Sequence, residues 1–269
     1  MVKKRKSKLV KKRKLKNVKK VYKKHRKQKV YKKEIKSKKV QTKIPNFDNL
    51  IGGGFEKNSS NIIAGGAGTG KTIFATQFLV EGMRNGEKCL YVTFEEKKEQ
   101  FYKNMLKFGW DLENYENKKM FTFLEYTPIK VKTMLDEGGG TIESAILRQG
   151  ISRVVIDSIT SFALLFDKEI EKREAALALF NMIGGWNCTS LLTLEEDLSD
   201  TKELSSKAIE FESDSIILVY FPSEKGVRNR YLEILKMRGV NHSKKVHKFE
   251  IGNKGISVSL KGLSKYSKK

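Results

Sequence analysis

The sequence predicts an α/β protein with a mostly parallel central sheet, helices on both faces of the sheet and antiparallel strands at its C-terminal edge. Two observations support this prediction. Between residues 61 and 221, short apolar runs alternate with longer segments whose apolar residues have helical spacing. From residue 231 to residue 260, only strand and hairpin patterns follow. Strands that alternate with helices form parallel sheets covered on both sides, whereas consecutive strands add antiparallel pairs at an edge.

The first half of the predicted fold begins near Val40 with the stretch TKIPNFDNLIGGGF, residues 42–55, which is typical of turns around a short apolar anchor. The predicted elements then run in the order strand 61–65, helix 71–86, strand 88–94 and helix 97–110. Asn85 and Gly86 end the first of these helices. The helical residues expected to face the core are Ile73, Phe74, Phe78, Leu79, Met83, Phe101, Met105, Leu106 and Phe108.

The second half continues this alternation and then changes to strands alone. The predicted elements are strand 120–126, the end of a helix at 142–150, strand 152–158, helix 172–186, strands 188–196, 213–221 and 231–239, and strand and hairpin segments at 246–260. Short apolar runs rich in β-branched and aromatic residues are typical of buried strands. We find no internal repeat in this part of the sequence.

The positive charge of the chain is concentrated at its N-terminus. Residues 1–40 contain 22 of the 55 Lys and Arg residues but only one of the 31 acidic residues, Glu34, so this segment carries most of the formal net charge of +24. Charge repulsion and a low apolar content prevent such a segment from folding alone. We therefore predict a polybasic tail at residues 1–40, disordered or conditionally helical, and one folded domain at residues 41–269.

Cysteine usage and hydropathy indicate a reducing, aqueous environment. Cys89 and Cys188 both lie in apolar runs, so we expect reduced core thiols rather than a disulfide. No apolar run approaches the length of a membrane-spanning helix, and the charged N-terminus has no apolar signal segment. The sequence therefore predicts a cytoplasmic protein.

Residues 65–72 match the phosphate-loop pattern G-x-x-x-x-G-K-[ST], between a predicted strand and a predicted helix. The eight residues are Gly65, Gly66, Ala67, Gly68, Thr69, Gly70, Lys71 and Thr72. Small residues let consecutive backbone N–H groups turn toward one anion, and the helix N-terminus adds its dipole. Lys71 supplies a cation for the β- and γ-phosphates, and the Thr72 hydroxyl is a ligand for Mg²⁺. The alternative is a glycine-rich turn without a ligand, but such a turn does not require the Gly-Lys-Thr ending.

Three acidic residues follow other predicted strands. Asp157 ends RVVID and is expected to hold Mg²⁺ through water, whereas Glu95 and Glu96 end YVTFEE and are candidates to orient and deprotonate the attacking water. Open parallel sheets bind their ligands at the carboxyl ends of the strands, which is where all of these residues fall. For each acid taken alone, the alternative is a solvated loop residue. The sequence does not say which glutamate acts as the base.

Seven segments together resemble the KaiC-like ATPases, in particular the single-domain archaeal proteins of that group. In chain order they are TKIPNFDNLIGGGF, GGAGTGKT, YVTFEE, FGWDLE, RVVIDSIT, LEILKMRGVNHS and VHKFEIGNKGI, which cover roughly residues 40–260. The resemblance implies a RecA-type P-loop fold, ATP with Mg²⁺ as cofactors, and a ring-shaped homo-oligomer, commonly a hexamer, with nucleotide between subunits. It also implies that Glu95 and Glu96 are the paired catalytic glutamates of the family.

The same resemblance assigns a role to residues far from the phosphate loop. Lys236 and Arg238 of KMRG match the family's element that reaches the nucleotide of the adjacent subunit, where it would neutralise transition-state charge as an arginine finger does. The alternative is that they are only the polar end of a strand. His242 is a weaker candidate for the same interface. We find no good match to the clock protein's regulated phosphorylation segment, so a clock or autokinase role is not implied.

Three positions depart from the family pattern. Lys43 and Asn46 replace the glycines usual in TGIPGFD, and Ala67 replaces the usual proline of the phosphate loop. These changes alter the stiffness of turns without removing a chemical group. They are expected to leave nucleotide binding intact and make the turnover rate less predictable.

The tail and the domain leave several hypotheses open. Residues 1–40 are expected to bind DNA or RNA without sequence preference, with Tyr22, His25 and Tyr31 available to stack on bases. The alternatives for the tail are binding to an anionic membrane surface and the lack of any dedicated partner.

For the domain, the first hypothesis is a ring ATPase that hydrolyses ATP slowly as a switch on a partner. A RadA-like recombination ATPase that forms filaments on DNA, and a nucleotide-binding scaffold without turnover, are the others.

Overall fold

The structure is a computed structural model that describes residues 39–127, 130, 133, 140–160, 166, 168–196 and 207–263. Of the predicted polybasic tail, only Lys39 and Val40 belong to these residues; the expectations for the rest of the tail lie outside the described part of the chain. In the described part, no helix is long and apolar enough to cross a membrane.

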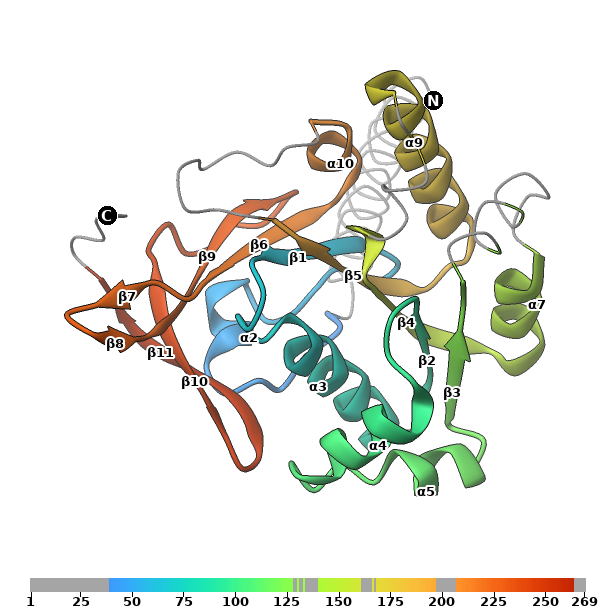
Figure 1. The fold of residues 1–269 in the computed structure, drawn as a ribbon, viewed down its shortest axis with the longest axis horizontal. Coiled ribbons are helices and arrows are strands. Elements are labelled where there is room, and N and C mark those ends of the chain that lie inside the picture. The colour runs from blue at the N-terminus through green and yellow to red at the C-terminus, as the bar shows by residue number, and fades with distance from the viewer. Residues whose placement is uncertain are drawn as a thin grey trace, which may run out of the picture. The chain divides into compact units, whose positions relative to one another are not determined.

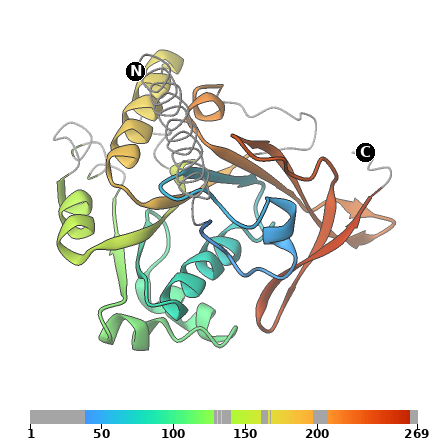
Figure 2. The ribbon, with the colours of Figure 1, turned by 180° about the vertical axis from the view of Figure 1, so that it is seen from behind.

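The described strands form a central sheet of nine members in the order β11-β10-β9-β6-β1-β5-β4-β2-β3 (Figure 1). Its strands are β1 (Ser60–Gly65), β2 (Lys88–Thr93), β3 (Phe121–Glu125), β4 (Ile151–Asp157), β5 (Thr189–Glu195), β6 (Ser215–Tyr220), β9 (Arg230–Met237), β10 (His247–Gly252) and β11 (Gly255–Gly262). Strands β1 to β6 pair in parallel, and β9, β10 and β11 pair antiparallel. Figure 2 shows from behind that the C-terminal strands (red) and β3 (green) lie at opposite edges. The predicted fold class is confirmed.

Helices cover both faces of this sheet. They are α2 (Phe47–Leu50), α3 (Lys71–Arg84), α4 (Lys98–Leu106), α5 (Leu112–Asn117), α7 (Gly140–Gln149), α9 (Glu169–Gly185) and α10 (Lys207–Glu212). Successive residues of a strand point to opposite faces. In β1, Ile63 packs in a core with residues of α2, α3 and α4, whereas Ile62 and Ala64 pack in a second core with residues of α7 and α9.

Most predicted elements are confirmed within one to three residues at their ends, but some details differ. Leu106 was expected to face the core and is instead 59 % exposed. Met105 is buried, whereas Leu106 is the last residue of α4 and lies on its exposed side. The segment expected to contain only turns includes the short helix α2. The helices α5 and α10 and the small hairpin of β7 (Ser223–Glu224) and β8 (Val227–Arg228) were not predicted.

Two turn residues in the first described segment adopt the left-handed backbone conformation. Lys43 has φ +52° and Asn46 has φ +67°, and both positions are those where the KaiC-like pattern has glycine. The carboxylate of Asp48 holds the turn, because it accepts hydrogen bonds from the backbone N–H groups of Thr42 and Lys43. Residues other than glycine are strained in this conformation, so the turn forms at some cost in stability.

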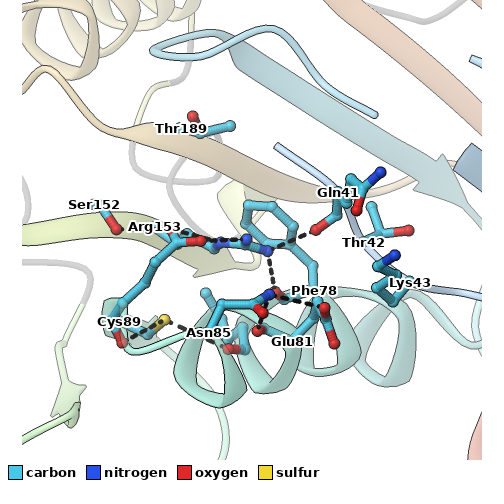
Figure 3. A network of polar contacts seen from close by, with 12 residues as sticks. Gln41, Thr42, Lys43, Phe78, Glu81, Asn85, Cys89, Ser152, Arg153 and Thr189 are labelled. Atoms are coloured by element: carbon cyan, nitrogen blue, oxygen red, sulfur yellow. Dashed lines mark hydrogen bonds and ion pairs between the residues drawn. The ribbon is translucent and has the colours of Figure 1, made fainter. Parts of the chain in front are cut away.

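A buried arginine ties the start of the folded domain to the sheet (Figure 3). Arg153 in β4 is 2 % exposed, and its Nη1 donates to the carbonyl oxygens of Gln41 and Phe78, each at 2.9 Å. Its Nε donates to the carboxylate of Glu87 at 2.9 Å, and its guanidinium lies 4.9 Å from the centre of the Phe78 ring. A side chain at Gly82 would collide with Arg153, with an added Cβ only 2.6 Å from Cδ. Gly82 therefore lets α3 pack closely over this cation.

Both cysteines are free and buried, as predicted. Cys89 lies in the first core, which contains α3, and Cys188 lies in the second core, which contains α9. Burial raises the pKa of the Cys89 thiol and raises that of Cys188 to about 11. Both thiols therefore stay protonated at neutral pH and act as packing groups.

Candidate nucleotide-binding site

The site predicted from the sequence is assembled at one end of the sheet, where the parallel strands finish. Because β1, β2, β4 and β5 are parallel, their carboxyl ends meet there. The strand register aligns Gly65 at the end of β1 with Glu195 at the end of β5, and Thr93 at the end of β2 with Asp157 at the end of β4. The phosphate loop, the Glu pair and Asp157 therefore surround one region.

Gly65, Gly68 and Gly70 of the phosphate loop occupy positions that disfavour a side chain, by backbone conformation or by close contact. Gly68 has φ +72° and Gly70 has φ +102°, both in the left-handed region. An added Cβ at Gly65 would lie 2.2 Å from the carbonyl oxygen of Val219, and one at Gly70 would lie 2.9 Å from Cδ1 of Ile251. The loop is therefore held closely between β6 and β10, and Gly70 caps the N-terminus of α3.

Lys71, the first residue of α3, folds back over the loop. Its Nζ donates hydrogen bonds to the carbonyl oxygens of Gly65 at 2.7 Å and Gly66 at 2.8 Å. Burial lowers the pKa of Lys71, and nearby carboxylates, Glu195 most strongly, oppose this effect. The ammonium group is thus fixed beside the helix N-terminus, where backbone amides and the helix dipole already favour an anion.

Asp157 is surrounded by three hydroxyl groups. Thr72 Oγ1 donates a hydrogen bond of 2.8 Å to Asp157 Oδ2, and the hydroxyl of Tyr91 donates to the same oxygen. The hydroxyl of Thr193 donates to Oδ1. The carboxylate is therefore oriented from β2, β5 and α3 at once. Burial and the negative charge of Asp157 raise the pKa of Tyr91 well above its usual value, so Tyr91 remains a hydrogen-bond donor at neutral pH.

The two glutamates after β2 have different partners. Glu95 Oε1 accepts a hydrogen bond of 3.2 Å from Ser158 Oγ, and Ser158 directly follows Asp157. Glu96 Oε1 accepts one of 3.3 Å from Asn104 Nδ2 of α4. Burial raises the pKa of Glu96, and Asp157 acts in the same direction while the Asn104 hydrogen bond opposes it. Glu95 is thus linked to the strand end that bears Asp157, and Glu96 is linked to α4.

The oxygen groups at this end of the sheet suit a magnesium ion bound together with phosphate. Within the described residues there is no group of three or more His, Cys, Asp or Glu side chains that could hold a metal by itself. Magnesium at nucleotide sites takes few protein ligands and keeps waters and phosphate oxygens. The Thr72 hydroxyl and the Asp157 carboxylate are hard oxygen donors already in contact, so they fit this coordination.

Lys236 and Arg238 lie at the opposite end of the sheet, where the parallel strands begin. Lys236 pairs with Ile216 near the amino end of β6, which runs parallel to β1, so it is remote from the phosphate loop of its own chain. Its Nζ donates to the carbonyl oxygens of Glu210 at 2.6 Å and Ser213 at 2.7 Å. Burial and the nearby charge of Arg238 lower the pKa of Lys236.

The other two candidates of this region also have partners within the chain. The guanidinium of Arg238 donates to the carbonyl oxygen of Phe211 and lies 3.6 Å from a carboxylate oxygen of Asp214. His242 Nδ1 lies 2.9 Å from the carbonyl oxygen of Ser243. The structure therefore does not bring Lys236, Arg238 or His242 to the phosphate loop of the same subunit, and their assigned role across a subunit interface stays a prediction.

Sequence reasoning missed several residues of the site. Tyr91 and Thr193 point from strand interiors to Asp157, and no motif marks them. Glu195 ends β5 in register with Gly65 and belongs to the run TLEE, which is the same signal of a strand followed by acids that identified Glu95. That signal could have found Glu195.

The parallel sheet, the strand–glycine loop–helix unit and the strand-end carboxylates define a RecA-type P-loop protein. The chain belongs to the KaiC family: the family model described as "ATPase: KaiC" matches residues 40–262. The resemblance seen in the sequence is thereby confirmed.

Individual relatives agree with this family. The chain is 34 % identical to UPF0273 protein PH0284 of Pyrococcus horikoshii, over 82 % of this chain and 94 % of that protein. It is 35 % identical to circadian clock protein KaiC3 of Synechocystis, over 82 % of this chain but only 45 % of that protein. The crystal structure of the KaiC-like protein PH0186 of Pyrococcus horikoshii superposes with a TM-score of 0.73 at 34 % identity, covering 83 % of this chain and 99 % of that one.

Proposed function

We propose that this chain binds ATP with Mg²⁺ at residues 65–72 and hydrolyses it slowly as a switch on a partner. The observation that supports ATP binding most directly is the contact of Thr72 with Asp157 beside the folded-back Lys71. These residues supply a hydroxyl, a carboxylate and a cation around a loop of backbone amides, which is the set that a nucleoside triphosphate requires.

Each residue of the candidate site has a defined task in this proposal. Backbone N–H groups of the loop bind the phosphates, and the Lys71 ammonium leaves the carbonyl oxygens of Gly65 and Gly66 for the β- and γ-phosphates. Thr72 and Asp157 would hold the magnesium ion. The ion neutralises phosphate charge when bound.

We assign the water-activating base to Glu95 rather than Glu96. The hydrogen bond from Ser158 supports this assignment, because it keeps the Glu95 carboxylate beside the strand end that bears Asp157. Glu95 is also among the groups whose charge acts on Lys71. Glu96, bonded to Asn104 of α4, is in our proposal the residue that fixes the position of the glutamate pair.

We propose that the subunits form a ring, a hexamer as the family resemblance implies. In such a ring, Lys236 and Arg238 would contact the nucleotide of the adjacent subunit. Their place beside the amino end of β6 supports this proposal, because the phosphate loop of the same chain lies at the carboxyl ends of the parallel strands. In the ring, each would leave the carbonyl groups in the last turn of α10 and contact the ATP of the adjacent subunit.

Phosphate release and light scattering with and without ATP test this function. We expect slow phosphate release by the wild type, none by the Glu95→Gln/Glu96→Gln double variant, and closed rings of constant size. Tight ATP binding without release would identify a nucleotide-binding scaffold instead. Filaments on single-stranded DNA, seen by electron microscopy, would favour the RadA-like alternative.

We further propose that residues 1–40 attach the ATPase to DNA or RNA. Their charge supports this, because neutralising several phosphates releases counterions and gives strong binding at low salt. We expect deletion of residues 1–40 to abolish retention on nucleic acid at low salt and to leave ATP binding intact. Equal retention by the shortened protein would contradict the proposal, and binding only to vesicles with anionic lipid would favour a membrane surface.

A further inference from the structure

Arg230, the first residue of β9, contacts the tip of the phosphate loop from 162 positions further along the chain. Its Nε and Nη2 both donate to the carbonyl oxygen of Gly68, at 3.2 and 3.0 Å. The guanidinium also lies 4.0 Å from the centre of the Phe221 ring. One side chain therefore joins the loop tip to an aromatic ring outside the loop.

The sheet holds Arg230 directly on the β10 side and through its neighbour Tyr231 on the β6 side. Residue Tyr231 pairs with Tyr220 of β6, and Arg230 itself pairs with Phe249 of β10. Backbone held by two neighbouring strands moves little, so the guanidinium is presented to the loop from a rigid part of the fold. A planar guanidinium that stacks on an aromatic ring and donates twice to one acceptor has few other orientations.

The contact also sets the direction of a backbone amide. In a trans peptide unit, the carbonyl and the N–H of the next residue point in opposite directions. When the Gly68 carbonyl points to Arg230, the N–H of Thr69 points in the opposite direction within the peptide plane, away from Arg230. Gly68 has φ +72°, and the Thr69 hydroxyl donates to the carbonyl oxygen of Gly66 at 2.8 Å, so this peptide unit is held at both ends.

We propose that Arg230 is a positioning residue for nucleotide binding: by holding the Gly68 carbonyl, it turns the Thr69 amide toward the phosphates. This inference rests on the proposed binding of ATP at residues 65–72. Preorganised donors bind better than donors that must be ordered on binding, so the contact raises affinity for any nucleotide whose phosphates occupy the loop.

Nucleotide affinity measured by calorimetry tests this role. We expect Arg230→Ala to raise the Kd of both Mg·ATP and Mg·ADP about threefold to tenfold, the loss of a partly exposed hydrogen bond to a charged group. Equal effects on the two nucleotides are expected because the loop binds phosphates that they share. An effect on ATP alone would overturn the proposal, since it would mean that Arg230 acts on the γ-phosphate.

Arg228 provides the matched control. It also lies near the Phe221 ring, at 5.6 Å, but its Nη1 donates to the carbonyl oxygen of Phe221 rather than to the loop. Arg228→Ala should therefore keep the wild-type Kd, and a loss as large as that of Arg230→Ala would overturn the proposal. Thermal unfolding of each variant shows whether it is folded.

A second variant covers the case in which Arg230→Ala does not fold. Arg230→Lys keeps the charge but loses the paired donors and the flat face, so we expect a Kd between those of the wild type and Arg230→Ala. A folded variant of either kind with wild-type Kd for both nucleotides would overturn this inference alone. A wild-type protein that binds no nucleotide would overturn the proposed function as well.

Discussion

Thr72 and Asp157 meet at a hydrogen bond of 2.8 Å, although 85 positions separate them in the sequence. The two residues come from α3 and from β4, and β5 lies between β1 and β4 in the sheet. Thr193 of β5 donates to the other oxygen of the same carboxylate. Tyr91 of β2, the strand on the other side of β4, also donates to this carboxylate. The strand order therefore determines which hydroxyl groups surround Asp157.

The different partners of the two glutamates lead to the first prediction. Glu95→Gln should lower the rate of phosphate release about 100-fold or more, the usual size of a lost general base, and should leave ATP binding unchanged. Glu96→Gln should have a clearly smaller effect on the rate, because this residue is bonded to α4. Single-turnover phosphate release measures both. A larger loss for Glu96→Gln would reverse the assignment.

A mixing experiment tests whether Arg238 acts on the adjacent subunit. Arg238→Ala and Glu95→Gln should each be inactive alone, yet a reassembled 1:1 mixture should recover about a quarter of wild-type turnover, because that share of interfaces in a mixed ring combines an intact Glu95 with an intact Arg238. The readout is phosphate release after mixing with and without reassembly. Activity of Arg238→Ala alone, at the wild-type rate, would mean that Arg238 only supports the strand end.

The left-handed turn at Lys43 predicts a stabilising substitution. Lys43→Gly should raise the free energy of unfolding by about 0.5–1 kcal/mol, because glycine relieves the backbone strain and loses part of this gain to its greater freedom in the unfolded chain. Asn46→Gly is the control, with a smaller gain, because Asn46 Nδ2 also donates to the carbonyl oxygen of Val258 at 2.7 Å. Denaturant unfolding measures both. Destabilisation by Lys43→Gly would show that its side chain contributes more than the strain costs.

The Arg153–Glu87 ion pair predicts a pH-dependent stability. Burial alone would raise the pKa of Glu87, but hydrogen bonds and charge from Arg153 outweigh it and lower the pKa below its usual value of 4.5. Because the folded-state pKa is the lower one, the contribution of Glu87 is complete above about pH 4.5 and is lost as the pH falls through the folded-state pKa.

The variant Glu87→Gln isolates this contribution. At neutral pH it should lower the free energy of unfolding by about 2–3 kcal/mol, less than for a fully buried pair because the Glu87 side chain is 31 % exposed. This deficit should shrink in acid. Glu81→Gln on α3, whose carboxylate bonds the exposed Asn85, should change stability by less than about 0.5 kcal/mol. Equal losses for the two variants would argue against a special role for Arg153.

The sequence alone was sufficient to predict those parts of the site whose motif lies within one local segment of the chain. The strand, glycine loop and helix around Lys71 are consecutive, Asp157 ends a recognisable apolar strand, and Glu95 follows another. Their meeting at one end of the sheet follows from the parallel strands, without knowledge of the strand order. This is why the phosphate loop and its acidic partners could be named before the fold was known.

Other features depend on contacts that local patterns do not contain. Tyr91 and Thr193 are ordinary strand residues until β2, β4 and β5 become neighbours. Arg230 reaches Gly68 only because β9 returns antiparallel beside β6. Leu106 has the right spacing for a buried residue, but α4 ends there and Met105 takes the inward position. Long-range packing, rather than periodicity, decides such cases.

Binding of Mg·ATP measured by titration calorimetry tests the central claim most directly. We expect a saturable heat of binding for the wild type, its loss for Lys71→Ala, and its retention for Lys88→Ala, whose exposed side chain lies at the opposite end of the parallel strands. No heat from folded wild-type protein, or equal uptake by Lys71→Ala, would contradict the account.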